Sequence, residues 1–212
     1  RFINFISRLR IDIRKLFLPN KLFINGYFKR TNGDIILNNN WGDDINISFL
    51  QDISDFNILV KNTSLLYRYL PIKSYNCIGS LIGYYTDKNT YIWGSGIISE
   101  DMPIPYKPVK VYSVRGPLTR KVLLDHRIDC PEIYGDPALL VSRYYRPRIS
   151  KTYEFGIIPH YTDEENTALT EFCRLHPDVL IIRMRGYNHW HDIPNQILSC
   201  KKVTSSSLHG LI

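Results

Sequence analysis

Residues 109–124 have the sequence VKVYSVRGPLTRKVLL, which decides the fold class. The apolar run at 109–114 predicts a buried strand, and Pro117 suits the first turn of the helix that residues 118–124 continue. Other apolar runs end in similar loops of Gly, Asp or Arg, as at 90–96. Strands that alternate with helical segments indicate an α/β fold with a mainly parallel sheet, in which ligands bind beyond the carboxyl ends of the strands.

Two such strand–helix series follow one another in the chain. Residues 142–152 between them contain four basic residues and a proline without an apolar period, so we predict an interdomain linker there. The domains expected are a helix at 1–20, an N-terminal α/β domain at 21–145 and the start of a C-terminal α/β domain at 152–212. The chain opens at Arg1 and stops as a new element begins, so we expect a fragment with an incomplete second domain.

The N-terminal segment combines a strong positive charge with an apolar face. Residues 1–21 contain six basic residues and one acidic residue, so five of the seven net positive charges of the chain lie there. The apolar residues of 2–16 recur at helical spacing. Such a helix either packs on the body of the protein or lies on an anionic membrane surface, and we leave both alternatives open for residues 1–17.

The composition excludes several classes of protein. The chain is 44% hydrophobic and 22% charged, as in an ordinary globular protein, and no apolar run is long enough to span a membrane. Residues 22–212 carry a net charge of only +2, which argues against a nucleic-acid partner. The four cysteines are far apart, without a CxxC pair, so we expect reduced thiols and no metal site.

The last predicted strand is followed by a hydroxyl-rich turn, Ser205, Ser206 and Ser207, and then by Leu208 and His209. Hydroxyls and free backbone N–H groups at a strand-to-helix turn can bind an anion. The histidine can exchange a proton near neutral pH or lie beside a phosphate as a cation. The alternative is an ordinary helix N-cap with an incidental surface histidine.

Four further residues or pairs lie in loops after predicted strands. Arg115 can bind a carboxylate or phosphate with its planar guanidinium, or form a surface salt bridge. His160 is a candidate acid or base, or a hydrogen-bonded structural histidine. Asp43 and Asp44 can orient a hydroxyl or cap the following helix. Asp136 is most simply a turn residue that bonds its own backbone.

Six stretches, taken in order, resemble the polysaccharide pyruvyl transferase family. They are residues 40–46, 93–96, 114–120, 135–140, 157–161 and 205–210. The resemblance implies two Rossmann-like domains similar to the GT-B glycosyltransferase fold, of which the second normally continues beyond the serine–histidine turn. It also implies a bacterial transferase of exopolysaccharide or cell-envelope biosynthesis in the cytoplasm, and the membrane alternative for residues 1–17 would place it at the inner face of the membrane.

The resemblance implies phosphoenolpyruvate as donor substrate, with no cofactor and no metal, and a glycan or lipid-linked sugar as acceptor. The product is a pyruvate ketal that bridges two hydroxyls of one sugar. Arg115 and the residues of the turn at 205–209 fall at positions for donor binding. His209 and His160 are then the acid and the base, in an order that the sequence does not decide.

Two other functions are compatible with this architecture. A nucleotide-sugar glycosyltransferase shares the two-domain arrangement, because a fold does not determine a function. A binding module without catalysis, attached to membranes through residues 1–17, belongs to a different class. Incubation with each donor distinguishes the two enzymes by which donor is consumed. Alanine substitution of Arg115 and His209 should abolish the function of either enzyme and leave that of a binding module unchanged.

Overall fold

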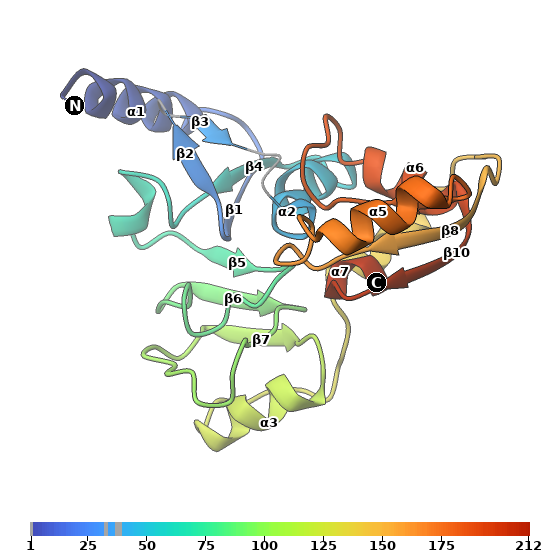
Figure 1. Cartoon of the computed structure of the whole chain (residues 1–212). Helices are drawn as coiled ribbons and strands as arrows, with labels where there is room; N and C mark the ends of the chain where they lie inside the picture. Colours follow the sequence, from blue (N-terminus) through green and yellow to red (C-terminus); the bar gives the residue numbers. More distant parts are fainter. Residues whose placement is uncertain (1, 32–33, 37–39) are drawn as a thin grey trace. The chain divides into compact units, whose positions relative to one another are not determined.

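The computed structural model describes residues 2–31, 34–36 and 40–212. The chain forms two compact units, of which the first contains residues 1–37 and 43–141 and the second residues 38–42 and 142–212. Each unit has its own parallel sheet, and Figure 1 labels their elements. The α/β fold with parallel sheets that the sequence predicts is therefore confirmed.

The first unit is built on a five-stranded parallel sheet with the order β4-β1-β5-β6-β7. The strands are β1 (Lys21–Asn25), β4 (Asn57–Val60), β5 (Ser74–Asn76), β6 (Thr90–Trp93) and β7 (Lys110–Ser113). Because β1 lies between β4 and β5, the strand order reverses at β1. Ligands of open α/β sheets bind beside such a reversal, at the carboxyl ends of the strands.

Two helices cover the two faces of this sheet. Residues in register on neighbouring strands point to the same face of a sheet. Asn25 of β1, Asn76 of β5 and Ile92 of β6 are in register and therefore share a face. On this face Ile92 packs in a core cluster with Leu123 of α3 (Pro117–Asp125), which Figure 1 shows next to β7. The opposite face packs against α2 (Trp41–Asp52), through a cluster that includes Leu50.

The smaller elements of the first unit lie outside this sheet. Strands β2 (Lys29–Thr31) and β3 (Asp34–Ile36) form an antiparallel pair. Single-turn helices η1 (Tyr67–Tyr69) and η2 (Pro137–Leu140) lie in connections between larger elements, and η2 leads directly into α4 (Val141–Tyr144). Helix α4 begins where the first unit ends, so part of the segment predicted as a linker is helical.

Helix α1 (Phe2–Lys15) is attached to the first unit through its C-terminal half. The buried carboxylate of Asp12 accepts hydrogen bonds from the Ser64 hydroxyl at 2.6 Å and from the Leu65 N–H at 3.0 Å. Leu16, just after the helix, packs against a cluster of β1 and β4 residues. The packing alternative is confirmed for this part of the segment.

The same helix leaves other large apolar side chains in contact with solvent. They are Phe5, Ile6 and Ile13, and Phe17 follows the helix with 84% of its surface exposed. The membrane alternative for residues 1–17 therefore stays a prediction. In the described part of the chain, no helix has the length and apolar character needed to cross a membrane.

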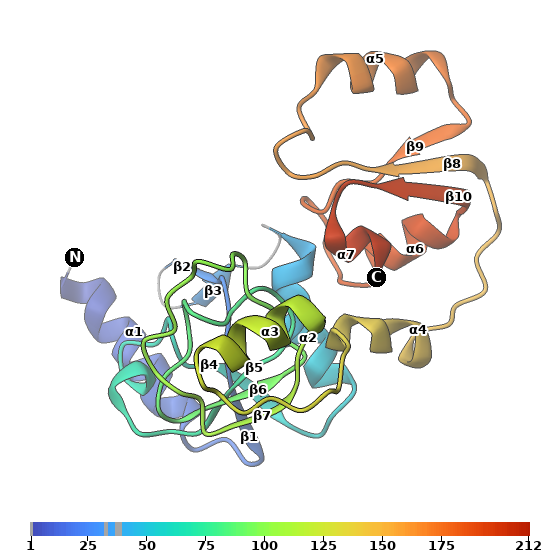
Figure 2. The same ribbon diagram turned by 90° about the horizontal axis from the view of Figure 1, so that it is seen from below.

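The second unit has a three-stranded parallel sheet with the order β10-β8-β9. Its strands are β8 (Tyr153–Ile158), β9 (Val179–Ile181) and β10 (Cys200–Ser205), and its helices are α5 (Thr167–Leu175), α6 (Asp192–Leu198) and α7 (Leu208–Leu211). Figure 2 shows α5 beyond β9, whereas α6 and α7 lie beside β10. The carboxyl ends of β8 and β10 are adjacent, because the two strands pair in parallel.

The sequence pattern predicts helices at residues 45–53 and 163–176, and both predicted starts are wrong. Helix α2 begins at Trp41 rather than Ile45, because the side-chain oxygen of Asn40 accepts the Gly42 N–H at 3.2 Å and caps the helix. Asp43 and Asp44 therefore lie inside its first turn and not in a loop. Helix α5 begins at Thr167, capped by Asn166, so the acidic residues at 163–165 form a turn before it.

Candidate functional site

In the first unit, the loops that follow β5, β6 and β7 meet at one edge of the sheet, because these strands are parallel neighbours. The loop after β7 carries Arg115, whose Nε donates to Oδ2 of Asp136 at 3.0 Å. Its Nη1 donates to the hydroxyl of Ser80, in the loop after β5, also at 3.0 Å. The salt-bridge alternative for Arg115 is confirmed, but the aspartate is buried and does not belong to the surface.

The guanidinium of Arg115 has unused hydrogen-bonding capacity. Its Nη2 is buried and has no hydrogen-bond partner among the described residues, while 19% of the side chain remains exposed. A buried donor without a partner costs about 1–3 kcal/mol, a cost that a bound anion would remove. Gly96 leaves the space for this group, since a Cβ there would lie 3.2 Å from the guanidinium carbon.

Asp136 holds the arginine with one carboxylate oxygen and its own backbone with the other. Oδ1 accepts the N–H of Ala138 at 3.0 Å and caps η2, which is the turn bond expected from the sequence. The carboxylate is 1% exposed, so it acts in the interior of the unit. This geometry fixes the orientation of the guanidinium before any ligand binds.

Helix α2 is attached to the loop after β5 by Asn46. Its side-chain amide donates to the Ile78 carbonyl at 2.7 Å and accepts the Ile78 N–H at 2.9 Å. This contact brings Asp43, one turn earlier, close to Gly79, where Oδ1 would lie 3.6 Å from a Cβ. Gly79 has φ +112°, a left-handed conformation that favours glycine.

Tyr27 joins this group from the loop after β1. Its hydroxyl donates to the Ser80 carbonyl at 2.9 Å, so Ser80 contacts both Tyr27 and Arg115. Burial raises the pKa of Tyr27, and the nearby Tyr85, Tyr84 and Asp43 raise it further, which keeps the phenol protonated. Neither Tyr27 nor Ser80 was predicted from the sequence. Ser80 lies in the loop after β5 and could have been found by that position, whereas nothing in the sequence around Tyr27 marks it.

Cys77 lies at the same edge of the sheet but is not a nucleophile. Burial, with a contribution from the charge of Asp136, raises the pKa of its thiol to about 12. At neutral pH the thiolate is therefore scarce, and this cysteine packs as a small apolar side chain.

In the second unit, the structure brings together two stretches predicted separately. The backbone N–H of His160, just after β8, donates to the Ser206 hydroxyl at 2.8 Å, and the Ser206 N–H donates to the Ile158 carbonyl at 3.1 Å. The His160 ring lies 2.8 Å from the hydroxyl of Thr162, measured from Nδ1. One histidine and the serine turn thus form a single local group.

The three serines of the turn have different environments. The Ser205 hydroxyl lies 2.8 Å from the Ser207 carbonyl and accepts the Ser207 N–H at 2.9 Å, so it holds the shape of the turn. Ser206 is exposed, and Ser207 is the N-cap residue of α7 without a side-chain cap bond. Leu208 is 47% exposed. Ser206 is therefore the exposed serine of the turn, and the half-buried Ser207 makes no cap bond with its side chain.

His209 packs against the start of α2, which belongs to the second unit as far as Gly42. A Cβ at Gly42 would lie 2.0 Å from Nδ1 of His209, so only glycine fits beside the imidazole. Trp41 fixes this segment, since its backbone N–H donates to the Met184 carbonyl at 2.8 Å and its indole donates to the Trp190 carbonyl at 2.7 Å. The Trp-Gly pair thus positions His209.

Comparisons with known proteins support one family. The sequence model described as polysaccharide pyruvyl transferase matches residues 9–212. An uncharacterised protein of Acanthamoeba polyphaga mimivirus is 35% identical over 131 residues, which make up 60% of this chain and 45% of that protein. The chain thus matches less than half of the relative's length. No solved structure matches the chain.

Proposed function

The chain belongs to the polysaccharide pyruvyl transferase family, and on this premise we propose that it transfers a pyruvyl group from phosphoenolpyruvate to a sugar. The acceptor is a sugar of a cell-surface polysaccharide or of its lipid-linked precursor, and the product is a pyruvate ketal. We further propose that the two units correspond to two Rossmann-like domains of GT-B type, at 21–145 and from 152 onward. The parallel strand order of the first unit supports this proposal.

The observation that carries the proposal is the geometry of Arg115. Phosphoenolpyruvate has about three negative charges at neutral pH, on a carboxylate and a phosphate that match a guanidinium fork. Arg115 is oriented by the buried Asp136 and by Ser80, and its Nη2 still lacks a partner among the described residues. In this proposal the unused donor binds the carboxylate or phosphate of the donor substrate.

We also assign the turn at the end of β10 to donor binding. Ser206 and Ser207 offer hydroxyls to the phosphate, and Ser205 keeps the turn in shape. Leu208 and His209 complete the group that we assign to donor binding. Gly42 supports this assignment, because it leaves room for the imidazole of His209 where any larger residue would displace it.

The reaction needs proton transfer but no change of oxidation state. An acid protonates the methylene carbon of phosphoenolpyruvate, and a base takes the proton of the first sugar hydroxyl as its oxygen bonds to C2. The bond between C2 and the phosphate oxygen breaks, inorganic phosphate leaves, and the second hydroxyl closes the ketal and gives up its proton. We assign the acid and base roles to His209 and His160, because imidazole exchanges protons near neutral pH.

Asp43, Asp44 and Asp136 have supporting roles in this proposal. Asp136 orients Arg115, as its hydrogen bond indicates. Asp43 lies near Gly79 at the carboxyl end of β5 and is available to a sugar hydroxyl on the acceptor side. Asp44 is buried in the first turn of α2, where the helix dipole stabilises a carboxylate.

We also propose a peripheral location at the cytoplasmic face of the membrane. The exposed Phe5, Ile13 and Phe17, together with the basic residues of α1, support binding to an anionic lipid surface. Deletion of residues 1–17 would remove the buried Asp12, so Phe17→Glu is the better test. It should reduce sedimentation with phosphatidylserine vesicles, and a wild-type protein that stays in the supernatant would refute the location.

The donor specificity is tested by incubation with phosphoenolpyruvate or with a nucleotide sugar, in the presence of an acceptor glycan. Release of inorganic phosphate, together with a gain of about 70 Da by the glycan, supports the pyruvyl transfer proposed here. Release of a nucleotide would identify a glycosyltransferase instead. If neither donor is consumed while the glycan still binds, and the Arg115→Ala and His209→Ala variants bind it equally, the chain is a binding module.

A further inference from the structure

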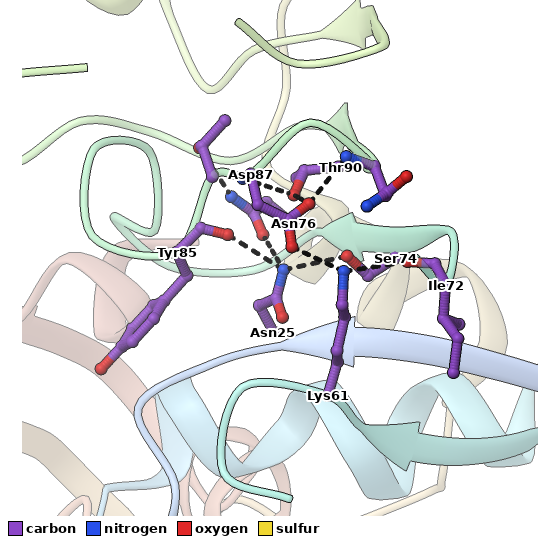
Figure 3. Close-up of polar contacts among 10 residues, drawn as sticks. Asn25, Lys61, Ile72, Ser74, Asn76, Tyr85, Asp87 and Thr90 are labelled. Atoms are coloured by element: carbon purple, nitrogen blue, oxygen red, sulfur yellow. Dashed lines mark hydrogen bonds and ion pairs between the residues drawn. The ribbon is translucent and has the colours of Figure 1, made fainter. Parts of the chain in front are cut away.

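The first unit contains a second polar group, on the face of the sheet that carries Asn25 and Asn76. Figure 3 shows it between β1, β5 and the segment at 85–90. A pocket of about 190 Å³ opens here, lined by Asn25, Lys61, Asn62, Arg68, Tyr84 and Tyr85 among others. It lies beside β1, where the strand order of the sheet reverses, which is the usual place for a ligand in an open α/β sheet.

The buried Asn25 lines this pocket and is held by a network of hydrogen bonds that includes a second buried amide, Asn76. The Asn25 amide donates to the Ser74 hydroxyl at 3.2 Å, the Asn76 side-chain oxygen at 3.0 Å and the Tyr85 carbonyl at 3.0 Å (Figure 3). The Asn76 amide in turn donates to the hydroxyl of Thr86 at 3.2 Å. These bonds hold the Asn25 side chain in place, so it offers a fixed polar group to the pocket.

One wall carries a charge pair that is neutral overall. The side chain of Lys61 is 2% exposed, and its Nζ donates to the Ile72 carbonyl at 2.9 Å and to Asp87 Oδ2 at 2.6 Å. The Asp87 side chain is 39% exposed, so the carboxylate is open to the pocket. Burial opposes the ionisation of Asp87, but hydrogen bonds from Lys61, Asn89 and Thr90 outweigh it and keep the pKa below its usual range. The carboxylate therefore accepts hydrogen bonds throughout the neutral range.

The rim of the pocket is aromatic. Tyr84 is 52% exposed, and its ring lies 5.8 Å from that of Tyr27, centroid to centroid. Tyr85 packs against the same Tyr27 ring at 5.0 Å. Because Tyr27 also contacts Ser80, which holds Arg115, the pocket is connected to the arginine through packed residues of one unit.

From these observations we propose that the pocket binds one pyranose ring of the acceptor glycan. The amides and the internally balanced Lys61–Asp87 pair suit the hydroxyls of a sugar, and tyrosine rings suit its C–H faces. A donor with three negative charges would meet the Asp87 carboxylate and, among the described residues that line this pocket, one exposed cation, Arg68. This inference rests on the proposed function, since it names the place of the acceptor.

A second pocket extends the first. It has a volume of about 350 Å³, shares Arg68 and Asp87 with the first pocket, and is also lined by Tyr69, Lys88 and Tyr106. Arg68 lies over the Tyr69 ring, 4.7 Å from its centroid. Two adjoining pockets with tyrosines and a shared polar boundary fit two neighbouring sugars of one chain. The occupant is thus a glycan rather than a free monosaccharide.

The binding test uses nuclear magnetic resonance of the ¹⁵N-labelled chain, titrated with the neutral disaccharides lactose, cellobiose and maltose. We expect at least one of them to shift the side-chain amide signals of Asn25 and Asn62, and phosphoenolpyruvate to leave these signals in place. Tyr84→Ala and Arg68→Ala should each weaken disaccharide binding about tenfold, because each removes a contact on the rim. Tyr144→Ala removes a tyrosine of similar exposure that lines neither pocket and is the matched control.

The kinetic test separates this inference from the proposed function. In phosphate release from phosphoenolpyruvate, Tyr84→Ala should raise the KM for the acceptor about tenfold and leave the KM for phosphoenolpyruvate unchanged. If phosphate is never released, the proposed function fails. If phosphate is released, but no disaccharide shifts the amide signals and the acceptor KM of Tyr84→Ala equals that of the control, the acceptor pocket is wrong and the reaction stands.

Discussion

Two cation–carboxylate pairs of the first unit differ in which partner is buried. In the pair of Lys61 and Asp87, the cation is 2% exposed and the carboxylate 39%. In the pair of Arg115 and Asp136, the carboxylate is 1% exposed and the cation 19%. The Arg115–Asp136 pair presents positive charge to a ligand and holds the cation with a buried carboxylate. The Lys61–Asp87 pair presents negative charge and buries the cation.

This difference separates a group that binds an anion from one that binds hydroxyls. Lys61 uses its Nζ for the Ile72 carbonyl and for Asp87, so its charge is balanced inside the unit. Arg115 uses Nε and Nη1 in the same way, but Nη2 has no partner among the described residues. The trianionic donor substrate is therefore expected to bind beside Arg115 and not beside Lys61.

The largest effect is expected from Arg115→Ala. Loss of the guanidinium should lower kcat/KM for phosphoenolpyruvate about 1,000-fold, which corresponds to about 4 kcal/mol of transition-state stabilisation. Phosphate release measures this change. Arg120→Ala is the matched control. Arg120 lies in α3, five residues after Arg115, and its Nε donates to the Cys130 carbonyl. Equal activity of the two variants would contradict the assignment of Arg115.

The next effect concerns stability rather than catalysis. Asp87→Asn leaves the Lys61 ammonium buried without its counterion, which should lower the free energy of unfolding by about 3 kcal/mol. The estimate lies at the low end of values for buried pairs, because Asp87 is partly exposed. Denaturant unfolding measures it. Asp125→Asn removes the exposed pair with Lys121, 61% exposed on both sides, and should cost less than about 0.5 kcal/mol. Similar costs for the two variants would show that burial of Lys61 is irrelevant.

Asp136→Asn sharpens the comparison from the other side. The amide keeps an acceptor for the Ala138 N–H but loses the charge beside Arg115, so we expect the guanidinium to be less well oriented. The KM for phosphoenolpyruvate should rise about 30-fold, an effect of about 2 kcal/mol, while the KM for the acceptor stays constant. A purely structural role would instead lower the amount of folded protein and leave both KM values unchanged.

The sequence predicts where the strands of the first unit lie better than it predicts which strands pair. The apolar runs at 57–60 and 90–93 each predict a strand from the sequence alone, and the structure forms β4 and β6 there with the same bounds. Strand β1 (Lys21–Asn25), which pairs with both β4 and β5, was not identified, because it follows directly on an amphipathic helix of similar apolar content. Central position in a sheet depends on long-range pairing, which no local pattern contains.

The candidate residues were found one by one, but their contacts were not. Arg115 and Asp136 both lie in loops after predicted strands, and their ion pair spans 21 positions that spacing alone does not bridge. Gly42 was part of a recognised motif, yet its function beside His209 follows only from the space that a Cβ would need. Local sequence therefore predicts where polar groups gather, and tertiary packing decides which groups touch.

The smallest effect is a dependence on pH. Because the native pKa of Asp87 is below its usual range, its ionisation stabilises the fold fully above the unfolded pKa of about 4, and this contribution is lost as the pH falls through the native pKa. The difference in unfolding free energy between the wild type and Asp87→Asn should therefore be constant from about pH 6 to 8 and shrink below about pH 4. Denaturant unfolding at several pH values measures it. A difference that persists undiminished in acid would mean that the ionised carboxylate does not stabilise Lys61, and that shape alone distinguishes the two pairs.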